Sequence, residues 1–598
     1  MAGTDPSAPR PRSPRRGPRR RRPGIVSWPL YRLLLVFALI PPVIAALTLS
    51  GTPQPPLPVQ QLSVTGTAVI SSAIRVFDAE HAVRGGCCQP GSPGDQAAAA
   101  WMDQALTGFD PHVQEEQFAA VPAGQTAAVA MTNVIAYRPG TQAGLIAVIA
   151  HRDGPGADNA ATSGILVQLA RALAPFIRQR GIVLVSTDGG TTGGQGAAYF
   201  ASHWPLADRI NGAIVITSPA APPGTPLSLQ TRSQVPVGTS PTLVAAAAEA
   251  ASQYAGTSLI VPGWLNQVVG YAVPYAPTEQ GPLLAHRVPA VTIEAGPPGG
   301  RAIGLKQLDA GQLGRTGTTV ANLVAALDTA PSFDPGGPPL LVMSGDRFLP
   351  ALVVEAVLAV LLAPALAAML DMVARLRRRR LALAPGLAAL AWRFSSWVVA
   401  LAAVWLVSVL PGHPLPPTSN PPLPGRTGVT LVGALLAAAL ALVYWRFIVQ
   451  PRLVRRAPVP AWERTGGLAG GLLGLGLASL LLLALNPYAL LLVLPAAHAW
   501  LWLPSAARRG RGLALAVYLV GLVGPVIVLL EMATTQDLGW DAPRAIVAVV
   551  SSGYQSPALS LCYALASAAA AQVAATVAGR YGPPHPPGSR AQGTYIGR

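Results

Sequence analysis

The chain has 598 residues, of which 51% are hydrophobic and only 11% are charged. Soluble globular proteins carry about 25% charged residues, so this composition excludes an ordinary soluble enzyme and indicates a membrane protein. The formal net charge is +17, and Arg, Pro and Gly are abundant, which is typical of a GC-rich bacterial genome. The three cysteines exclude a disulfide scaffold and a cysteine-ligated zinc module.

The chain begins with a basic arm. Eight arginines lie among Pro and Gly residues between positions 10 and 22, a composition that predicts disorder over residues 1–24. The apolar run Leu33–Leu49 follows, and the positive-inside rule keeps its arginine-rich side in the cytoplasm. We therefore interpret residues 25–50 as an uncleaved transmembrane signal anchor. A cleaved signal peptide is the competing interpretation, and we expect no nucleic-acid partner for the arm.

Further apolar stretches of about 20 residues recur after residue 345, each near the length of a membrane-spanning helix. They are Pro350–Leu370, Phe394–Leu410, Val429–Trp445, Gly466–Leu485, Tyr488–Leu503, Gly512–Leu530 and Pro557–Gly579. With the first helix, the sequence predicts eight transmembrane helices, of which seven form a bundle over residues 346–580.

The loops between these stretches alternate in charge. Arginine-rich loops, such as the one with Arg377–Arg380, alternate with loops that are almost free of cations, such as Gly412–Gly425. This alternation predicts a multi-pass protein of the cell membrane, with the lipid bilayer as a partner. Both termini, including the tail 581–598, would then be cytoplasmic and residues 51–345 extracytoplasmic. Glu355 is the main charge expected inside the bundle, close enough to its outer end to reach the interface.

The middle of segment 51–345 alternates between strand and helix patterns. Four short apolar runs bounded by turn residues predict buried strands, and helical spacing follows two of them; the runs are 144–150, 181–186, 212–217 and 290–294. This order predicts an α/β domain with a mostly parallel sheet covered by helices. Ligands of such sheets bind at the carboxyl ends of the strands, which carry His151, Asp153, Asp188 and Thr217.

These strand ends resemble the M28 family of zinc aminopeptidases. The likeness is carried by NVIAYRPG, then GLIAVIAHRDGPGADNAATSGILVQLARAL, then GIVLVSTDGGTTGGQGAAYFA, and it covers Asn133–Ser218 well and extends weakly to about residue 330. The specific part is the order of motifs: His-x-Asp after a strand, Gly-Ala-Asp-Asn before a helix, and a Gly-rich turn before another helix. The resemblance implies an M28-like fold of the phosphorylase/hydrolase type.

The family has two zinc ions that share a bridging aspartate, and a glutamate that acts as the general base. By position, His151 matches the histidine ligand, Asp153 the residue that orients this histidine, and Asp158 the bridging aspartate. Such ligands leave an open position on zinc, which lowers the pKa of its bound water, and a neighbouring carboxylate then takes the proton.

The remaining family positions depart from this pattern. Gly190 and Thr191 stand where the family has its glutamate base and the following ligand, and Thr217 stands at the next acidic ligand. Gly296–Thr319, where the last histidine ligand is expected, contains no histidine. Glycine cannot accept a proton, and a threonine hydroxyl is a poor zinc ligand. We therefore predict that His151 and Asp158 are vestigial and that no cofactor binds.

Other groups could rebuild a metal site. Asp188, His203 and Glu294 lie near the lost positions in the sequence or at strand ends, and zinc would be the cofactor if they replaced the missing ligands. The prediction of an inactive site and this alternative differ in one measurable quantity, the zinc content of the protein.

The whole architecture resembles the GPI-transamidase subunit that carries a non-catalytic peptidase-like domain, and the multi-spanning M28 peptidases of the endoplasmic reticulum. We therefore predict a pseudo-peptidase that acts as a binding or assembly module, with a peptide or protein partner at its outer domain. One alternative is an active zinc aminopeptidase with a rearranged site. The other is a transporter or lipid-handling bundle, which the absence of internal repeats makes less favoured.

Overall fold

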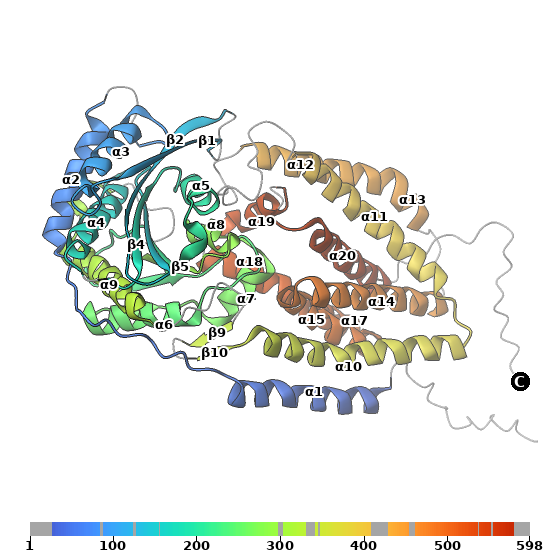
Figure 1. Cartoon of the computed structure of the whole chain (residues 1–598). Coiled ribbons are helices and arrows are strands. Elements are labelled where there is room, and N and C mark those ends of the chain that lie inside the picture. The colour runs from blue at the N-terminus through green and yellow to red at the C-terminus, as the bar shows by residue number, and fades with distance from the viewer. Residues whose placement is uncertain are drawn as a thin grey trace, which may run out of the picture.

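The computed structural model describes residues 27–83, 88–122, 127–154, 156–176, 178–296, 303–330, 341–344, 347–407, 428–453, 461–535, 538–551 and 554–578. The predicted basic arm 1–24 and the tail 581–598 lie outside these ranges. The described chain forms an α/β domain and a helical bundle that lie end to end, with the sheet at one end and the long helices at the other (Figure 1).

An eight-stranded mixed sheet forms the centre of the α/β domain, in the order β1-β2-β4-β3-β5-β8-β6-β7. The strands are β1 Gln114–Ala120, β2 Val129–Arg138, β3 Leu145–His151, β4 Gly181–Thr187, β5 Ile210–Ile216, β6 Leu227–Gln230, β7 Leu259–Ile260 and β8 Ala290–Glu294. The four predicted strands are β3, β4, β5 and β8, and they pair in parallel. The predicted α/β fold is confirmed, and the sheet is mixed because β1, β2 and β6 add antiparallel pairs at its flanks.

Helices cover both faces of this sheet, which explains why its central strands are apolar throughout. Successive side chains of a strand point to opposite faces. Ile146 and Val148 of β3 join a large core with α2 (Gly66–His81), α4 (Ala157–Leu173) and α9 (Ala310–Thr329). Ala147 and Ile149 join a smaller core with α5 (Gln195–His203) and α8 (Gln280–Ala285). The helices α3 (Pro93–Leu106) and α6 (Pro241–Glu249) complete the first layer.

The helical bundle contains the candidate membrane spans. Its helices are α1 (Trp28–Thr48), α10 (Ala351–Arg378), α11 (Ala384–Val407), α12 (Gly428–Tyr444), α13 (Gln450–Leu453), α14 (Ala461–Leu485), α15 (Leu490–Ala499), α16 (Leu503–Arg509), α17 (Arg511–Gly521), α18 (Val523–Thr535), α19 (Ala542–Ser551) and α20 (Pro557–Val577). Among the described residues, seven helices are long and apolar enough to cross a membrane, or eight if the pair α17 and α18, bent by 52°, counts as one span. This number is compatible with the eight predicted spans.

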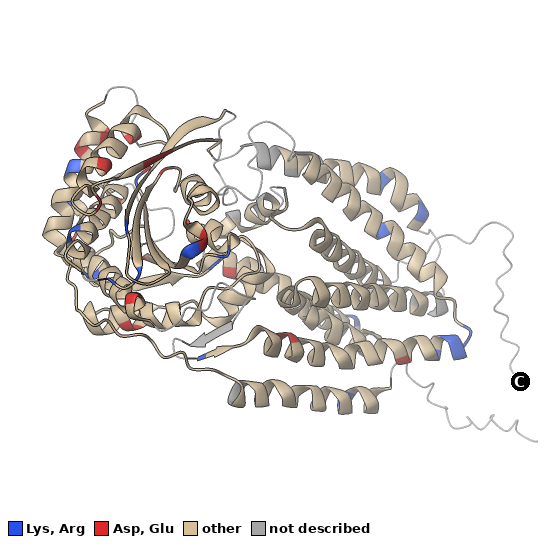
Figure 2. Ribbon diagram, in the orientation of Figure 1, with Lys and Arg blue, Asp and Glu red and all other residues tan. Residues whose placement is uncertain are grey.

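Charged residues are sparse along the bundle helices (Figure 2). One of them lies where the sequence indicated none, because α11 begins at Ala384, ten residues before the predicted span Phe394–Leu410. Arg393 is therefore inside the helix, only 5% exposed, and it donates hydrogen bonds to the carbonyl of Ala389 and to Gln572 of α20. The glutamine lets the bundle hold an arginine that breaks the apolar run in the sequence.

The α/β domain is attached to the bundle at both of its ends. Gly51, after α1, and Phe348, before α10, donate backbone hydrogen bonds to each other, both of 3.0 Å. Phe348 belongs to a small hairpin of β9 (Leu341–Ser344) and β10 (Arg347–Leu349). A third attachment is α7 (Trp264–Ala272), a helix of the α/β domain that lies at the junction with the bundle (Figure 1).

Candidate functional site

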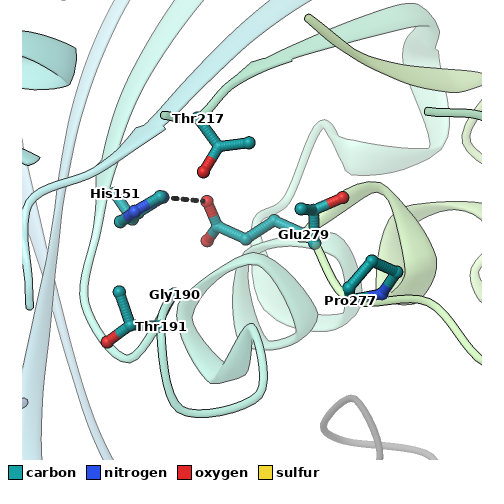
Figure 3. A pocket seen from close by; sticks show the side chains of 7 residues that line it. His151, Gly190, Thr191, Thr217, Pro277 and Glu279 are labelled. Atoms are coloured by element: carbon teal, nitrogen blue, oxygen red, sulfur yellow. Dashed lines mark ion pairs between the residues drawn. The ribbon is translucent and has the colours of Figure 1, made fainter. Parts of the chain in front are cut away.

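A small pocket lies at the carboxyl ends of the parallel strands, where the sequence predicts a site. Its lining residues are His151, Gly190, Thr191, Thr217, Pro277, Thr278 and Glu279 (Figure 3). His151 is the last residue of β3, Gly190 and Thr191 follow β4, and Thr217 follows β5. Pro277 to Glu279 come from a different segment, which precedes α8. The strand ends thus bring four of the sequence-predicted positions together.

The pocket is too small for a substrate in this conformation. Its volume of about 20 Å³ is room for about one water molecule. An amino-acid residue can enter only if one of the lining groups moves, and the two largest side chains among them are those of His151 and Glu279.

His151 and Glu279 form a buried ion pair across the pocket. The Nδ1 atom of His151 lies 3.5 Å from a carboxylate oxygen of Glu279, and the two residues are 5% and 1% exposed (Figure 3). Thr187, the last residue of β4, donates a hydrogen bond of 2.7 Å to the other carboxylate oxygen. The second ring nitrogen of His151, Nε2, lies 3.2 Å from the side-chain oxygen of Asn159. Both ring nitrogens therefore face protein partners.

The electrostatics of the pocket favour a charged histidine. Burial has the largest single effect on the pKa of His151 and lowers it, but the hydrogen bond and charge of Glu279, with the charges of Asp153 and Asp158, raise the pKa to about 9. The imidazole is thus protonated near neutral pH. A histidine must be neutral to bind a metal ion, so metal binding here would have to displace a proton and break the pair with Glu279.

Gly190, at the position of the family's glutamate base, is tightly enclosed. A Cβ atom placed on Gly190 would lie 2.3 Å from Cβ and 2.7 Å from Cγ of His151, and 3.2 Å from Cδ of Glu279. No side chain fits there while His151 and Glu279 hold these positions.

Asp153 has a different role from the one that the family resemblance implies. Its carboxylate accepts hydrogen bonds from the backbone N–H of Gly190, at 2.7 Å, and of Thr191, at 3.1 Å, and from the hydroxyl of Thr191. The described hydrogen bonds of Asp153 therefore hold the turn after β4, whereas His151 is oriented by Asn159 and Glu279. The hydroxyl of Thr191, at a lost ligand position, is directed to this carboxylate.

Asp158, at the position of the bridging aspartate, lies in the first turn of α4 and does not line the pocket. Its carboxylate accepts a hydrogen bond of 2.9 Å from the backbone N–H of Ala220. Burial raises the pKa of Asp158 to about 6, against the opposing effects of this hydrogen bond and of the charge on His151. The aspartate thus ties the loop after β5 to the start of α4.

The three residues that could have rebuilt the site lie elsewhere. Asp188 faces Arg152, at 3.4 Å, in a separate buried network. His203 stacks on Tyr199 of α5 with 4.0 Å between ring centroids. Glu294 accepts hydrogen bonds from two side chains of β6, and burial raises its pKa to about 7. None of the three lines the pocket.

The donor set of the pocket does not fit a centre of two zinc ions. Its only metal-ligating groups are His151 and Glu279, which pair with each other, since the hydroxyls of Thr191 and Thr217 are poor zinc ligands. Within the described part of the chain, one group of three potential ligands lies close enough to share an ion, formed by Glu80, His81 and Cys88, but Cys88 is disulfide-bonded and none of the three lines the pocket.

The family of the α/β domain follows from its sequence together with this fold. Residues 133–261 match the model of peptidase family M28. The α/β domain is an M28 peptidase-like domain. The matched segment begins in β2 and contains every strand end that forms the pocket, which confirms the resemblance predicted from the motifs. No curated protein sequence matches the chain significantly.

Solved structures similar to the M28-like domain include both cyclases and peptidases. The glutaminyl cyclase of an Acidobacteriales bacterium is 17% identical, with a TM-score of 0.36, over 46% of this chain and 98% of the cyclase. BSAP, a zinc aminopeptidase of Bacillus subtilis, is 10% identical, with a TM-score of 0.36, over 46% of this chain and 99% of the aminopeptidase. Such identities and TM-scores say nothing about the activity of this chain.

Glu279 is the site residue that sequence reasoning missed. It lies 128 residues after His151, and no family motif connects the two. A signal was nevertheless present, because Glu279 is the single acidic residue between Glu249 and Glu294. A lone carboxylate in such an apolar stretch needs a buried partner, which the histidine at the end of β3 provides.

Proposed function

We propose that this chain is a multi-pass membrane protein whose M28-like domain is a pseudo-peptidase, a binding or assembly module on the outer face of the cell membrane. The apolar helices of the bundle and the alternation of arginine-rich loops support this placement. The fold of the domain alone does not imply hydrolysis, since folds of this kind host many functions.

The pairing of His151 with Glu279 across Gly190 carries the proposal. It engages the histidine that would hold a metal ion and fills the space that the base would need. Without the base, a general-base mechanism loses a factor of about 10²–10⁴ in rate. Without a metal-bound water, the nucleophile is lost as well. We propose a peptide or protein partner that contacts the rim of the strand ends, because the pocket itself holds about one water molecule.

One observation favours the alternative, an active zinc aminopeptidase with a rearranged site. Glu279 returns a carboxylate to the pocket, beside the histidine of the His-x-Asp motif. A zinc ion that displaced the proton of His151 could take Glu279 as a second ligand. This alternative still lacks the bridging carboxylate, because Asp158 lies outside the pocket lining.

The test uses the full chain in detergent micelles, loaded with zinc, dialysed, and measured for bound metal and for hydrolysis of aminoacyl chromogenic substrates. We expect no stoichiometric zinc and no turnover above that of the variant His151→Ala. Close to two zinc ions per chain, the stoichiometry of two-metal hydrolases, together with turnover that a chelator abolishes, would refute the pseudo-peptidase. Zinc that His151→Ala and Glu279→Ala both remove would favour the rearranged site.

A further inference from the structure

The helix α7 belongs to the M28-like domain in sequence but packs against the helical bundle. Tyr271 and Ala272 are buried in the same apolar core as Tyr488 and Leu559 of the bundle. Val269 of α7, with Val273 and Tyr275 just after the helix, joins a second core with Val528 and Met532 of α18. One side of α7 is therefore covered by bundle helices rather than by its own domain.

Side chains of the bundle also satisfy the carboxyl end of α7. Asn486 donates a hydrogen bond of 2.7 Å to the carbonyl of Tyr271, and the hydroxyl of Tyr563 donates one of 3.1 Å to the carbonyl of Ala272. The last carbonyls of a helix have no partner within the helix, so these two bonds fix the end of α7 to the bundle.

The segment that leaves this fixed end leads directly to the pocket. Tyr275 is fully buried in the core shared with α18, and Pro277, Thr278 and Glu279 then line the pocket. Seven residues after Ala272, the chain thus places the carboxylate of Glu279 beside His151 (Figure 3). The position of Glu279 depends on where the bundle holds the end of α7.

Arg232, in the loop after β6, makes a second connection between the bundle and this segment. Its guanidinium is buried, with Nη2 3.9 Å from a carboxylate oxygen of Glu531 in α18, and its Nε donates to the side chain of Asn266 in α7 at 3.2 Å. Its backbone carbonyl accepts a hydrogen bond of 3.1 Å from the side chain of Gln280, the neighbour of Glu279. Burial lowers the pKa of Arg232 to about 10, so the guanidinium stays charged at neutral pH.

We propose that Arg232 is a positioning residue for Glu279, and that the pairing of Glu279 with His151 is held in place by the docking of α7 on the bundle. The pocket is then coupled to the bent pair α17 and α18, which carries Glu531. A change in that bend would shift Arg232 and α7 together and would open or close the pocket. This coupling goes beyond the proposed function and holds whether the pocket is catalytic or not.

The test measures how readily a thiol in the pocket reacts. Thr217→Cys places the thiol among the lining residues, and the full chain in lipid nanodiscs is alkylated with N-ethylmaleimide, which adds to the thiol without a leaving group. Peptide mapping then separates this site from Cys562, which is buried in the bundle, and from Cys88. In the otherwise unchanged chain, Glu279 and His151 close the pocket and the reaction is slow.

Two variants loosen the connection from opposite sides. We expect Arg232→Ala and Glu531→Gln, each combined with Thr217→Cys, to react about 5- to 30-fold faster, the range that corresponds to the loss of 1–2 kcal/mol. Glu531→Gln keeps the shape of the side chain and leaves the M28-like domain untouched, so it remains informative if Arg232→Ala folds poorly.

Arg180→Ala is the matched control. Arg180 is a buried arginine of the same domain that donates to the carbonyls of Leu327 and Ala330, and it precedes β4 at the opposite end of the strands. We expect its loss to lower the stability of the domain without speeding alkylation at position 217. Unchanged rates in both Arg232→Ala and Glu531→Gln, or an equal acceleration by Arg180→Ala, would overturn the coupling.

Discussion

Gly190 and His151 approach each other so closely that a methyl group on Gly190 would lie 2.3 Å from Cβ of the histidine. The family's catalytic base would stand on this glycine, while the histidine would hold its metal ion. In this chain the glycine leaves the room in which His151 meets Glu279. The absence of a side chain at position 190 and the ion pair of His151 with Glu279 are thus two aspects of one packing arrangement.

The first prediction concerns the size of residue 190. We expect Gly190→Ala to lower the free energy of unfolding by about 1–3 kcal/mol, the usual cost of overpacking a filled interior. Gly108→Ala is the control, since a Cβ there meets nothing within 4 Å. Thermal unfolding of the purified full chain compares the two. A Gly190→Ala protein as stable as the control would show that His151 is free to move.

The same close approach predicts the outcome of an attempt to restore catalysis. The double variant Gly190→Glu, Thr191→Glu replaces both members of the family's acidic pair. We expect no hydrolysis of aminoacyl substrates, because the new side chain collides with His151 and Glu279 and two further ligands are still absent. Measurable, zinc-dependent turnover in this variant would contradict the prediction.

The third prediction concerns the ion pair itself. Glu279→Gln leaves the charge of His151 buried beside a neutral amide, and removal of one partner of a buried pair costs about 3–5 kcal/mol. We expect a clear fall in the unfolding temperature, whereas Glu115→Gln on the exposed edge strand β1 should change it little. Equal unfolding temperatures for the two variants would mean that Glu279 contributes nothing to stability.

The fourth prediction follows from the raised pKa of His151. A histidine whose pKa rises from 6.5 to about 9 on folding stabilises the protein fully below pH 6.5, and this contribution is lost as the pH rises through about 9. The total is roughly 3 kcal/mol. The acids around the imidazole are Glu279, Asp153 and Asp158. We therefore expect the unfolding temperature to fall between pH 6.5 and pH 9.5.

The double variant His151→Gln, Glu279→Gln isolates this contribution. Burial raises the pKa of Glu80 to about 8, so this group titrates in the same range, but it is present in both proteins. The difference in unfolding temperature between the unchanged chain and the double variant should shrink as the pH rises. A difference that stays constant from pH 6 to pH 10 would show that folding does not raise the pKa of His151.

The fifth prediction tests the membrane topology. The alternation of arginine-rich loops predicts that the M28-like domain lies outside the cytoplasm and both termini inside. Cysteines at positions 100 and 380, both exposed, should react with an impermeant reagent from opposite sides of the membrane. The variants Ala100→Cys and Arg380→Cys are compared in intact cells and in inverted vesicles. Labelling of both from the same side would refute the topology.

Local sequence patterns were sufficient to predict the parallel centre of the sheet. The strands β3, β4, β5 and β8 are buried on both faces. A strand of this kind has a continuous apolar run in its sequence, which makes it recognisable. The antiparallel flanks were missed because β1 is a polar edge strand and β6 has only four residues, so neither carries a strong pattern.

The site was predicted in position but not in its contacts. His151, Gly190, Thr191 and Thr217 come together because strands of known direction end there. The partner of His151 could not be predicted, since Glu279 reaches it from a segment that α7 holds against the bundle. Arg393 shows the same limit, because its partner Gln572 lies 179 residues away and makes an inward-facing arginine tolerable.

The paired backbone hydrogen bonds between Gly51 and Phe348 mean that the chain enters and leaves the M28-like domain at one place. The M28-like domain is thus an insertion in the chain between two helices, α1 and α10, that pack side by side. A linker of a few residues could replace the M28-like domain and still connect α1 to α10 in their present positions. Excision would nevertheless uncover the apolar cores that α7 shares with the bundle, so we expect the shortened bundle to keep its helix order but to be less stable.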